Sequence, residues 1–350
     1  MRILIVTDAW SPQVNGVVRT LNAVIKELEA KGHDVRTINP AGRPSWPMPF
    51  YPEITLTGTN AADISAEISR IAPDVIHIAT EGPLGWAARR ACLREGLRFT
   101  TGFHTRFAEY AAARIPLPGV LSIGWRTLQH FHKPSQAVMV PTRSIGMELD
   151  RRRFTNVKIW TRGVDRSIFK PYDRDHLPFP RPIVLYAGRL AIEKGIDDFI
   201  ALKTPGSKVL VGDGPERARL EKLAPSAHFL GFRHGEDYAR TLASADVMVF
   251  PSRTDTFGLV MLEAMACGTP VAAYNAPSPL DVVEDGVTGA IADTLEEAVQ
   301  RAAVIGRDRV REGSMKFSWR SCADMFESWL VPCGPLPSHG GADFALALPR

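Results

Sequence analysis

Two carboxylates lie on either side of a glycine turn in the segment TDTFGLVMLEAMACGTPV, residues 254–271. Asp255 precedes the turn and can accept hydrogen bonds from sugar hydroxyls, whereas Glu263 would lie on the following helix and can hold a ribose. That helix would begin with backbone N–H groups able to face phosphate oxygens, those of Phe257, Gly258 and Leu259. The combination suits a nucleotide sugar. A buried helix with polar ends is the alternative, because the residues between the carboxylates are mostly apolar.

Two cations follow another apolar run, in the segment YAGRLAIEKG at residues 186–195. If the loop curls back toward the strand end, Arg189 and Lys194 can neutralise one diphosphate leaving group, and Arg189 can do so through two parallel hydrogen bonds. Such neutralisation matters because breaking a glycosyl–phosphate bond puts negative charge on the departing phosphate. The alternative is a solvated loop and a capped helix, but Gly188 and Gly195 favour a site.

The N-terminal half adds a glycine turn and a histidine. In SPQVNGVVRT, residues 11–20, Gly16 would stand between a strand end and a helix N-terminus, where backbone can approach an anion closely. In GFHTRFAEY, residues 102–110, His104 would follow a strand at residues 97–101. There it can bond a sugar hydroxyl or steady an oxocarbenium-like centre through its carbonyl and ring nitrogen. A structural role is the alternative for a single histidine.

Further glycine turns are compatible with a base or ribose pocket. VGDGPE at residues 211–216 contains Gly212, and Gly231 and Phe232 follow the next short strand, although any tight strand-to-helix turn would use such glycines. The sequence Asp-Arg-Asp at 173–175 has the DxD spelling of metal-dependent sugar transfer, but it lies in a proline-rich stretch, so we interpret it as a chance match. No other carboxylate pair suggests a metal, and no complete GxGxxG or P-loop occurs.

The elements that would position these residues alternate along the chain. Short valine- and isoleucine-rich runs predict strands at residues 2–6, 74–78, 137–140, 182–187, 208–211 and 247–250, with helical patterns between them. Such alternation is typical of an α/β protein with parallel sheets covered by helices on both faces. After Gly16, apolar residues recur at helical spacing up to Leu28, and Gly32 stands where a C-terminal cap is expected.

The pattern restarts near residue 182, after a segment at residues 170–182 with four prolines. We predict two doubly wound, Rossmann-like domains, at residues 1–169 and 183–316, joined by the linker 170–182 and facing each other across a cleft. A final helix is expected at residues 317–331 and a flexible tail at 332–350. Ligands would bind at the carboxyl ends of the strands, with a donor on one wall of the cleft and an acceptor on the other.

Composition narrows the class of protein. With 350 residues the chain exceeds what one core usually serves, and 45% hydrophobic with 23% charged residues is an ordinary globular composition. The net charge of +4 permits attraction to phosphate ligands or an anionic membrane, but it falls short of a nucleic-acid-binding protein. Four scattered cysteines fit a reducing cytosol, and no run is long enough for a signal peptide core or a membrane span.

Residues 106–133 combine aromatic and basic side chains around the sequence IPLPG, among them Trp125, Arg126, Phe131 and Lys133. An amphipathic face that meets anionic lipid is one interpretation of this segment, and a solvated surface is the other. Because no run is long enough to span a membrane, any membrane contact is expected to be peripheral.

Four segments together, PQVNGVVRT, GFHTRFAEY, AGRLAIEKG and TDTFGLVMLEAMACGTPV, resemble in order and spacing the retaining glycosyltransferases of family 4. The resemblance spans roughly residues 1–330. It implies the GT-B arrangement of two domains, with the acceptor on the N-terminal domain and the nucleotide sugar on the C-terminal domain. It also implies transfer with retained anomeric configuration, no required metal, and a final helix that crosses back to the first domain.

The resemblance also implies roles for single residues. Gly16 would approach the donor diphosphate, Arg189 and Lys194 would neutralise it, and His104 would contact the transferred sugar. Glu263 would hold the ribose and Asp255 would meet sugar hydroxyls. The family usually has glutamate at the position of Asp255, so the shorter side chain puts donor choice and sugar geometry in doubt. A protein nucleophile is not evident, which fits a mechanism in which the departing phosphate accepts the acceptor proton.

The N-terminal motifs are similar to a set that includes bacterial mannosyltransferases and enzymes that place glucose-like sugars on diacylglycerol. We predict a cytoplasmic enzyme, peripheral on the inner face of the cell membrane, without a cofactor or a nucleic-acid partner. It would move a hexose or hexuronate from a UDP-sugar to a lipid such as diacylglycerol. The alternatives are a GDP-mannose-dependent α-mannosyltransferase acting on another glycolipid or a soluble acceptor, and a non-catalytic nucleotide-sugar-binding protein. The oligomeric state is left open.

Overall fold

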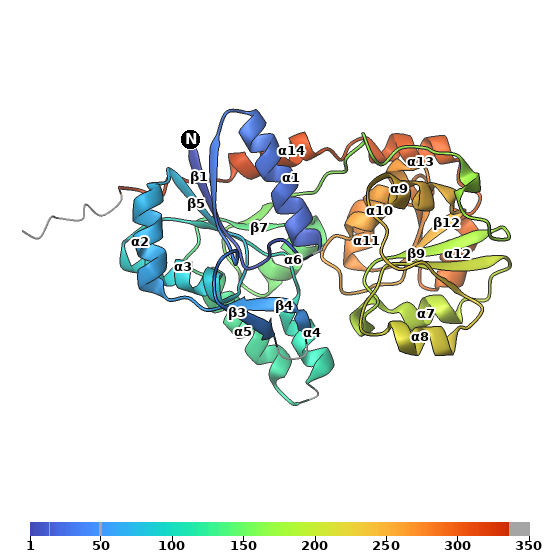
Figure 1. The fold of residues 1–350 in the computed structure, drawn as a ribbon, viewed down its shortest axis with the longest axis horizontal. Helices are drawn as coiled ribbons and strands as arrows, with labels where there is room; N and C mark the ends of the chain where they lie inside the picture. Colours follow the sequence, from blue (N-terminus) through green and yellow to red (C-terminus); the bar gives the residue numbers. More distant parts are fainter. Residues whose placement is uncertain (14, 49–50, 116, 336–350) are drawn as a thin grey trace, which may run out of the picture.

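The computed structural model describes residues 1–13, 15–48, 51–115 and 117–335, and the chain folds into two lobes that lie side by side (Figure 1). Each lobe is built on a six-stranded sheet, and the strand pairs within both sheets are parallel. The strand order is β2-β1-β5-β6-β7-β8 in the first lobe and β11-β10-β9-β12-β13-β14 in the second. The predicted α/β fold with two doubly wound, Rossmann-like sheets is confirmed.

The first lobe contains its sheet, a short antiparallel hairpin and six helices within the described ranges. Its sheet strands are β1 (Arg2–Val6), β2 (Asp34–Ile38), β5 (Val75–Ile78), β6 (Thr100–Gly102), β7 (Val138–Val140) and β8 (Val157–Ile159), and the hairpin is β3 (Ser45–Met48) with β4 (Tyr51–Thr57). Its helices are α1 (Gly16–Ala30), α2 (Ala61–Ile71), α3 (Pro83–Arg94), α4 (Phe107–Arg114), α5 (Val120–His132) and α6 (Arg143–Arg151).

The second lobe repeats this alternation. Its strands are β9 (Ile183–Ala187), β10 (Ser207–Val211), β11 (His228–Phe229), β12 (Val247–Phe250), β13 (Val271–Tyr274) and β14 (Gly289–Ala292). Its helices are α7 (Ile196–Ala201), α8 (Arg217–Leu223), α9 (Gly235–Ser244), α10 (Leu259–Ala266), α11 (Pro277–Val282), α12 (Leu295–Ala302) and α13 (Arg307–Ser314), and α14 (Trp319–Ser328) follows them. Two 3₁₀ turns, η1 (Arg174–His176) and η2 (Ile192–Lys194), lie before and after β9.

Helix α1 shows how local sequence sets the start of an element near the cleft. The side-chain oxygen of Asn15 accepts hydrogen bonds from the N–H groups of Val17 and Val18, each at 3.0 Å, and so caps the helix. A buried stripe at helical spacing faces the sheet: Val18, Leu21, Val24 and Leu28. Gly32 follows the helix with φ of +86°, a left-handed conformation that favours glycine, as predicted for the C-terminal cap.

The strand that leads to His104 is shorter than predicted. The sequence suggested residues 97–101, but β6 covers Thr100–Gly102. Leu97 and Phe99 are buried, yet the Leu97 N–H donates to the Cys92 carbonyl at 2.8 Å and therefore belongs to the turn that ends α3. Burial alone made this segment look like strand, and the sheet pairing begins only where Thr100 meets His77.

The last helix, α14, lies on the first lobe although it follows the second lobe in sequence (Figure 1). Cys322, Ala323 and Phe326 are buried against β1 and α1. Lys31 at the end of α1 pairs with Asp324 at 2.7 Å and with Glu327. Beyond α14, Cys333 is buried and its N–H donates to the Asp74 carbonyl at 2.9 Å, so the start of the predicted tail is held to the first lobe at this residue. Residues 336–350 lie outside the described part of the chain.

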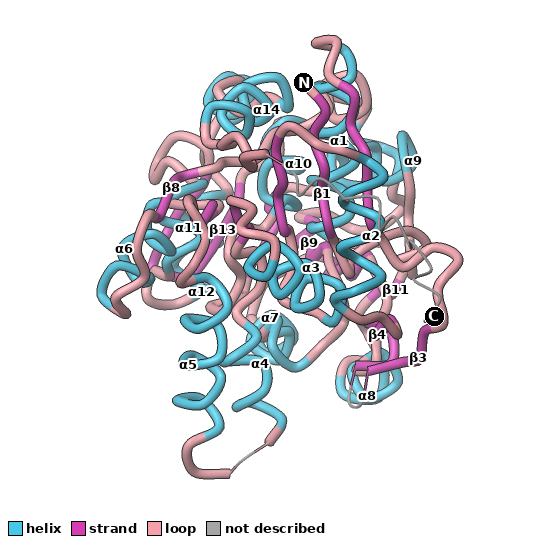
Figure 2. The backbone as a smooth tube through the Cα atoms, turned by 90° about the vertical axis from the view of Figure 1, so that its left-hand side faces the viewer, coloured by secondary structure: helices cyan, strands magenta, loops and turns pink. Residues whose placement is uncertain are grey.

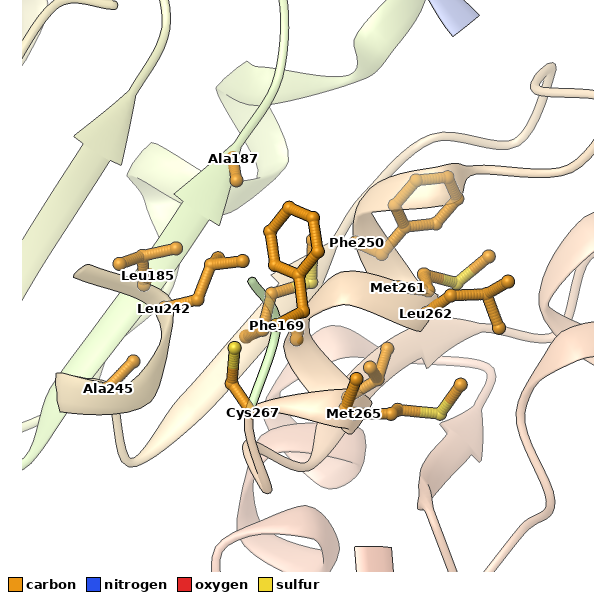
Figure 3. Close-up of a cluster of buried hydrophobic side chains, with 14 of the residues drawn as sticks. Phe169, Leu185, Ala187, Leu242, Ala245, Phe250, Met261, Leu262, Met265 and Cys267 are labelled. Carbon is orange, nitrogen blue, oxygen red and sulfur yellow. The ribbon is translucent and has the colours of Figure 1, made fainter. Parts of the chain in front are cut away.

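The chain passes between the lobes twice, and the two passages touch. A Cβ atom built on Gly163 would lie 2.3 Å from the backbone nitrogen of Trp319, so no side chain fits between the segments there. After this point the first passage enters the core of the second lobe, where Phe169 packs near Leu242 and Met261 (Figure 3). Phe169 was predicted to end the first domain, but its side chain lies in the second core.

Candidate active site

A cavity of about 1710 Å³ lies between the two lobes and is called the cleft below. Its walls come from the loops that follow β1, β5, β6, β9, β10 and β12, at the carboxyl ends of the strands of both sheets. Ligands in open parallel sheets bind at these strand ends. The volume exceeds the roughly 300–1,000 Å³ of a typical small-molecule site, so the cleft has room for two substrates.

Most of the predicted site residues line the cleft together. They are Gly16 and His104 from the first lobe, and Arg189, Lys194, Gly212, Phe232, Asp255, Phe257, Gly258 and Leu259 from the second. Gly231 and Glu263 are not among the described residues that line it. The Gly231 carbonyl accepts a hydrogen bond from the Gly212 N–H at 2.8 Å, and Glu263 lies behind two other side chains. Which of these residues contact substrate stays a prediction.

Lys194 and Asp255 form an ion pair in the wall of the second lobe. The Lys194 side chain is 21% exposed and that of Asp255 is 12% exposed, so the pair is largely removed from water. Burial would lower the pKa of the Lys194 ammonium, but Asp255, Tyr110 and Tyr186 more than offset this effect and the pKa is raised. The site therefore holds a fixed positive charge beside the carboxylate.

The loop that carries Arg189 is clamped against the neighbouring glycine turn. The Gly188 N–H donates to Val211 and the Leu190 N–H donates to Asp213, each at 2.9 Å. A Cβ atom on Gly212, whose φ is +126°, would lie 2.0 Å from the Gly188 carbonyl oxygen. Gly212 therefore allows the loop that carries Arg189 to approach the turn after β10 closely. Its predicted place in a base or ribose pocket stays a prediction.

Two helix N-termini meet across the cleft, one from each lobe. Gly258 precedes α10 with φ of +80°, and a Cβ atom there would lie 2.7 Å from the Phe250 ring. A Cβ atom on Gly16, the first residue of α1, would lie 3.7 Å from the Leu259 side chain. The partial positive charge of both helix ends therefore falls on the same part of the cleft, which suits a phosphate group.

His104 is a neutral imidazole at the floor of the cleft. The Arg162 guanidinium donates to its Nδ1 at 3.0 Å, and this contact places the imidazole proton on Nε2. Burial, together with the charge of Arg162, lowers the pKa of His104 well below its ordinary value. Nε2 has no hydrogen-bond partner among the described residues, whereas the His104 carbonyl accepts from Thr256 Oγ1 at 2.6 Å. Nε2 is itself buried beside Gly102, so a hydrogen bond from the ring to a ligand stays a prediction.

Glu263 is the most deeply buried of the predicted site residues on α10. One oxygen, Oε1, forms an ion pair with Arg19 of the first lobe, and the other, Oε2, accepts from the Tyr238 hydroxyl at 3.1 Å. Arg19 and Tyr238 both line the cleft. Sequence reasoning missed both residues. Arg19 lies three positions after Gly16, one helical turn along the same face, and this spacing could have indicated that it faces the same site. No sequence pattern indicated Tyr238.

The first lobe supplies an apolar wall to the cleft. It is formed by Trp86, Ala108, Ala111, Leu128 and Phe131, which come from α3, α4 and α5. Helices α4 and α5 cross closely, since a Cβ atom on Gly124 would lie 2.9 Å from Ala108. They form a hairpin that projects from the lobe (Figure 2). Exposed apolar side chains lie near its tip: Leu117, Leu121 and Ile123.

The described ranges offer neither a cluster of metal ligands nor a membrane-spanning helix. There, no group of three or more His, Cys, Asp or Glu side chains is placed to hold a metal ion. Asp173 and Asp175 of the DxD-like sequence lie at η1 in the linker, and neither is among the described residues that line the cleft. No helix in this part of the chain has the length and apolar character needed to cross a bilayer.

The two facing lobes and their cleft define a protein of the GT-B class, and solved structures agree. Sucrose-phosphate synthase of Thermosynechococcus elongatus superposes with a TM-score of 0.74 at 20% identity, covering 93% of this chain and 97% of the other. HepE of Anabaena, solved with UDP and glucose, gives a TM-score of 0.71 at 18% identity over 94% and 98% of the two chains. These similarities show the fold alone, and the predicted GT-B fold is confirmed.

Sequence comparison identifies the family. Residues 14–168 match the family described as Glycosyltransferase Family 4, and residues 170–305 match Glycosyl transferases group 1. A GDP-mannose-dependent alpha-mannosyltransferase of Mycolicibacterium smegmatis is 34% identical over 84% of both chains. One of Mycobacterium tuberculosis is 30% identical over 97% of this chain and 96% of its own. The chain therefore belongs to the glycosyltransferases of family 4, and it is an enzyme that transfers a sugar from a nucleotide sugar.

Two further relatives carry other names. Sulfoquinovosyl transferase SQD2 of Arabidopsis thaliana is 29% identical over 80% of this chain and 61% of its own. A GDP-mannose-dependent alpha-(1-6)-phosphatidylinositol dimannoside mannosyltransferase of Mycobacterium tuberculosis is 28% identical over 92% and 94% of the two chains. The similarity to both kinds of enzyme agrees with the predicted branch of the family.

Proposed function

We propose that the chain is a retaining glycosyltransferase that moves a hexose from a nucleotide sugar to a lipid acceptor without a bound metal. The observation that carries this proposal is the two-sided character of the cleft. Its second-lobe wall presents Arg189, Lys194 and a glycine-capped helix N-terminus, which suit a sugar diphosphate. The part of its first-lobe wall formed by α3, α4 and α5 is apolar and continues into a hairpin with exposed apolar residues, which suits a lipid.

On the donor side, Arg189 and Lys194 would neutralise the diphosphate together with the N-termini at Gly16 and Leu259. Asp255 would bond sugar hydroxyls, Glu263 would hold the ribose, and Gly212, Gly231 and Phe232 would border the base. His104 would donate from Nε2 to a hydroxyl of the transferred sugar. The predicted divisions, 1–169, 170–182, 183–316 and 317–331, are retained as the proposed domains, although the side chain of Phe169 packs in the second core.

The ion pair at Lys194 bears on the stereochemistry. The ammonium of Lys194 draws charge from the Asp255 carboxylate and makes it a poorer nucleophile, which favours transfer without a covalent glycosyl intermediate. In the proposed reaction the bond from the anomeric carbon to the phosphate oxygen breaks and the acceptor oxygen bonds to the same face. The acceptor proton passes to the departing phosphate oxygen. Arg189 and Lys194 stabilise the charge that develops on that phosphate.

The α4–α5 hairpin supports a membrane-bound acceptor. Leu117 is 66% exposed and Ile123 is 63% exposed near its tip. Between Glu109 and Glu148 the sequence has four lysines and arginines and no aspartate or glutamate. An exposed apolar tip within a positively charged segment fits an anionic lipid surface. The four cysteines are free and buried, which is consistent with the proposed cytoplasmic side of the membrane.

For the donor, the relatives favour GDP-mannose, because several of them carry names that specify it. We therefore propose GDP-mannose as the first donor to test. A UDP-hexose or UDP-hexuronate, which the sequence motifs favoured, is the second candidate, since the similarity to a sulfoquinovosyl transferase extends to a different sugar.

The test uses the full chain with GDP-mannose or UDP-sugars and anionic vesicles that contain diacylglycerol or phosphatidylinositol mannosides. We expect a glycolipid detectable by mass spectrometry, with the donor anomeric configuration retained in its NMR spectrum and unchanged yield after chelation of divalent metals. Transfer to water-soluble acceptors alone would contradict the lipid assignment. Donor binding with neither transfer nor hydrolysis would favour a non-catalytic binding protein.

A further inference from the structure

We propose that Arg19 gates the donor site: in the ligand-free protein its guanidinium occupies the place of the donor ribose at Glu263, and it must leave before a nucleotide can bind. The inference rests on the proposed function, because it takes Glu263 as the ribose ligand. It adds a residue that sets donor affinity although it lies on the opposite lobe.

The first observation is that both oxygens of Glu263 are occupied. Arg19 pairs with Oε1 and the Tyr238 hydroxyl donates to Oε2. Arg19 and Tyr238 line the cleft, whereas Glu263 is not among the described residues that do. A ribose that approaches from the cleft therefore meets these two side chains before it meets the carboxylate. Each carboxylate oxygen can accept a second hydrogen bond, but Glu263 is almost fully buried, so ribose hydroxyls reach it only if one of these side chains moves aside.

The second observation identifies Arg19 as the side chain that moves. Glu263 retains 4% exposure, so it cannot follow a partner into water, whereas the Arg19 side chain retains 41%. Burial and the neighbouring Glu263 raise the pKa of the Tyr238 hydroxyl far above its ordinary value, so this group remains a protonated donor. Arg19 can turn into the open cleft and be hydrated there, while Tyr238 keeps its hydrogen bond. Ribose hydroxyls then satisfy the oxygen that Arg19 leaves.

The third observation concerns the lobes. Arg19 lies on α1 of the first lobe and Glu263 on α10 of the second, so their ion pair joins the two walls of the cleft. The pair Lys194–Asp255 lies within the second lobe and persists if the lobes separate. Nucleotide entry is therefore coupled to release of one contact between the lobes, and the ligand-free protein is held in a form that cannot accept ribose. The apparent affinity for a nucleotide is then the intrinsic affinity multiplied by the fraction of molecules in which the Arg19–Glu263 pair is broken.

The test compares wild type with two Arg19 variants by calorimetric titration with GMP and with UMP at pH 8. Arg19→Met removes the guanidinium and keeps an apolar stem of similar reach. We expect the monophosphate that binds wild type to bind this variant about tenfold more tightly. This change corresponds to about 90% of the wild-type molecules having Arg19 paired with Glu263. Arg19→Lys, which keeps the charge but not the planar fork, should lie between the two.

Two controls separate the outcomes. Lys26→Met removes an exposed cation from the same helix without touching Glu263 and should leave the affinity unchanged. Glu263→Gln tests the donor site itself and should weaken binding. If Glu263→Gln has no effect, the ribose assignment in the proposed function fails. If Glu263→Gln weakens binding but Arg19→Met leaves it unchanged or weaker, while its melting curve stays cooperative, the gate alone is overturned.

Discussion

The ion pair of Lys194 and Asp255 permits a quantitative prediction about stability. Replacing Asp255 with Asn removes the charge that holds a largely buried ammonium, and breaking such a pair costs about 3–5 kcal/mol. Because Lys194 retains 21% exposure, the lower end of this range applies. Near the melting point, about 3 kcal/mol corresponds to a fall of about 6–12 °C in a domain of this size. The raised pKa of Lys194 means that this stabilisation is present throughout neutral pH and is lost only at strongly alkaline pH.

The assay is thermal and urea unfolding of the ligand-free protein, followed by circular dichroism. The matched control is Asp197→Asn, which breaks a pair with Arg219 whose side chains are 54% and 49% exposed, and it should cost less than about 1 kcal/mol. The double variant Lys194→Met with Asp255→Leu removes both charges and should recover most of the stability while transfer stays abolished. The reasoning is refuted if Asp255→Asn is no more harmful than Asp197→Asn.

Three further predictions concern charge and the membrane. Arg189→Ala should lower kcat by at least about a hundredfold while the melting temperature stays near that of wild type, because the lost cation acts on the departing phosphate; a near-normal rate would remove Arg189 from the site. The lowered pKa values of His104 and His77 predict that unfolding takes up a proton at each of them below about pH 6.5, so each should reduce stability by up to about 1.4 kcal/mol per pH unit on acidification. His104→Gln should remove about half of this slope, measured by urea titration from pH 7 to pH 5, and an unchanged slope would contradict the neutral assignment. Leu117→Asp with Ile123→Asp should reduce sedimentation with anionic vesicles and spare donor hydrolysis, and undiminished sedimentation would exclude the hairpin tip as the contact.

The sequence predicted the fold well because its signals were local. Valine- and isoleucine-rich runs located six of the strands, namely β1, β5, β7, β9, β10 and β12, and the capping residues of α1 set its ends within one or two positions. The error at residues 97–101 has a physical cause. Leu97 and Phe99 are as buried as strand residues, and hydrophobicity does not report which carbonyl a backbone N–H meets.

The site was only partly predictable because several of its contacts join distant segments. Motifs placed Arg189, Lys194 and Asp255 on one wall, and local glycine turns gave a reason for each. The partners of Glu263 are different, since Arg19 lies 244 positions earlier in the chain and on the other lobe. Arg162, which fixes the protonation of His104, lies 58 positions after it and followed no motif. Such pairings depend on how the lobes face each other, and composition or periodicity does not encode that directly.

The close passage at Gly163 restricts how the molecule can change shape. Two backbone segments lie in contact there, so the lobes cannot twist freely as they would on a single flexible tether. We expect the lobes to pivot near Trp319, so a small rotation would displace most the parts that lie furthest from this point, among them the α4–α5 hairpin (Figure 1). Under the function proposed above, such opening would be greatest on the side of the molecule that meets the lipid acceptor.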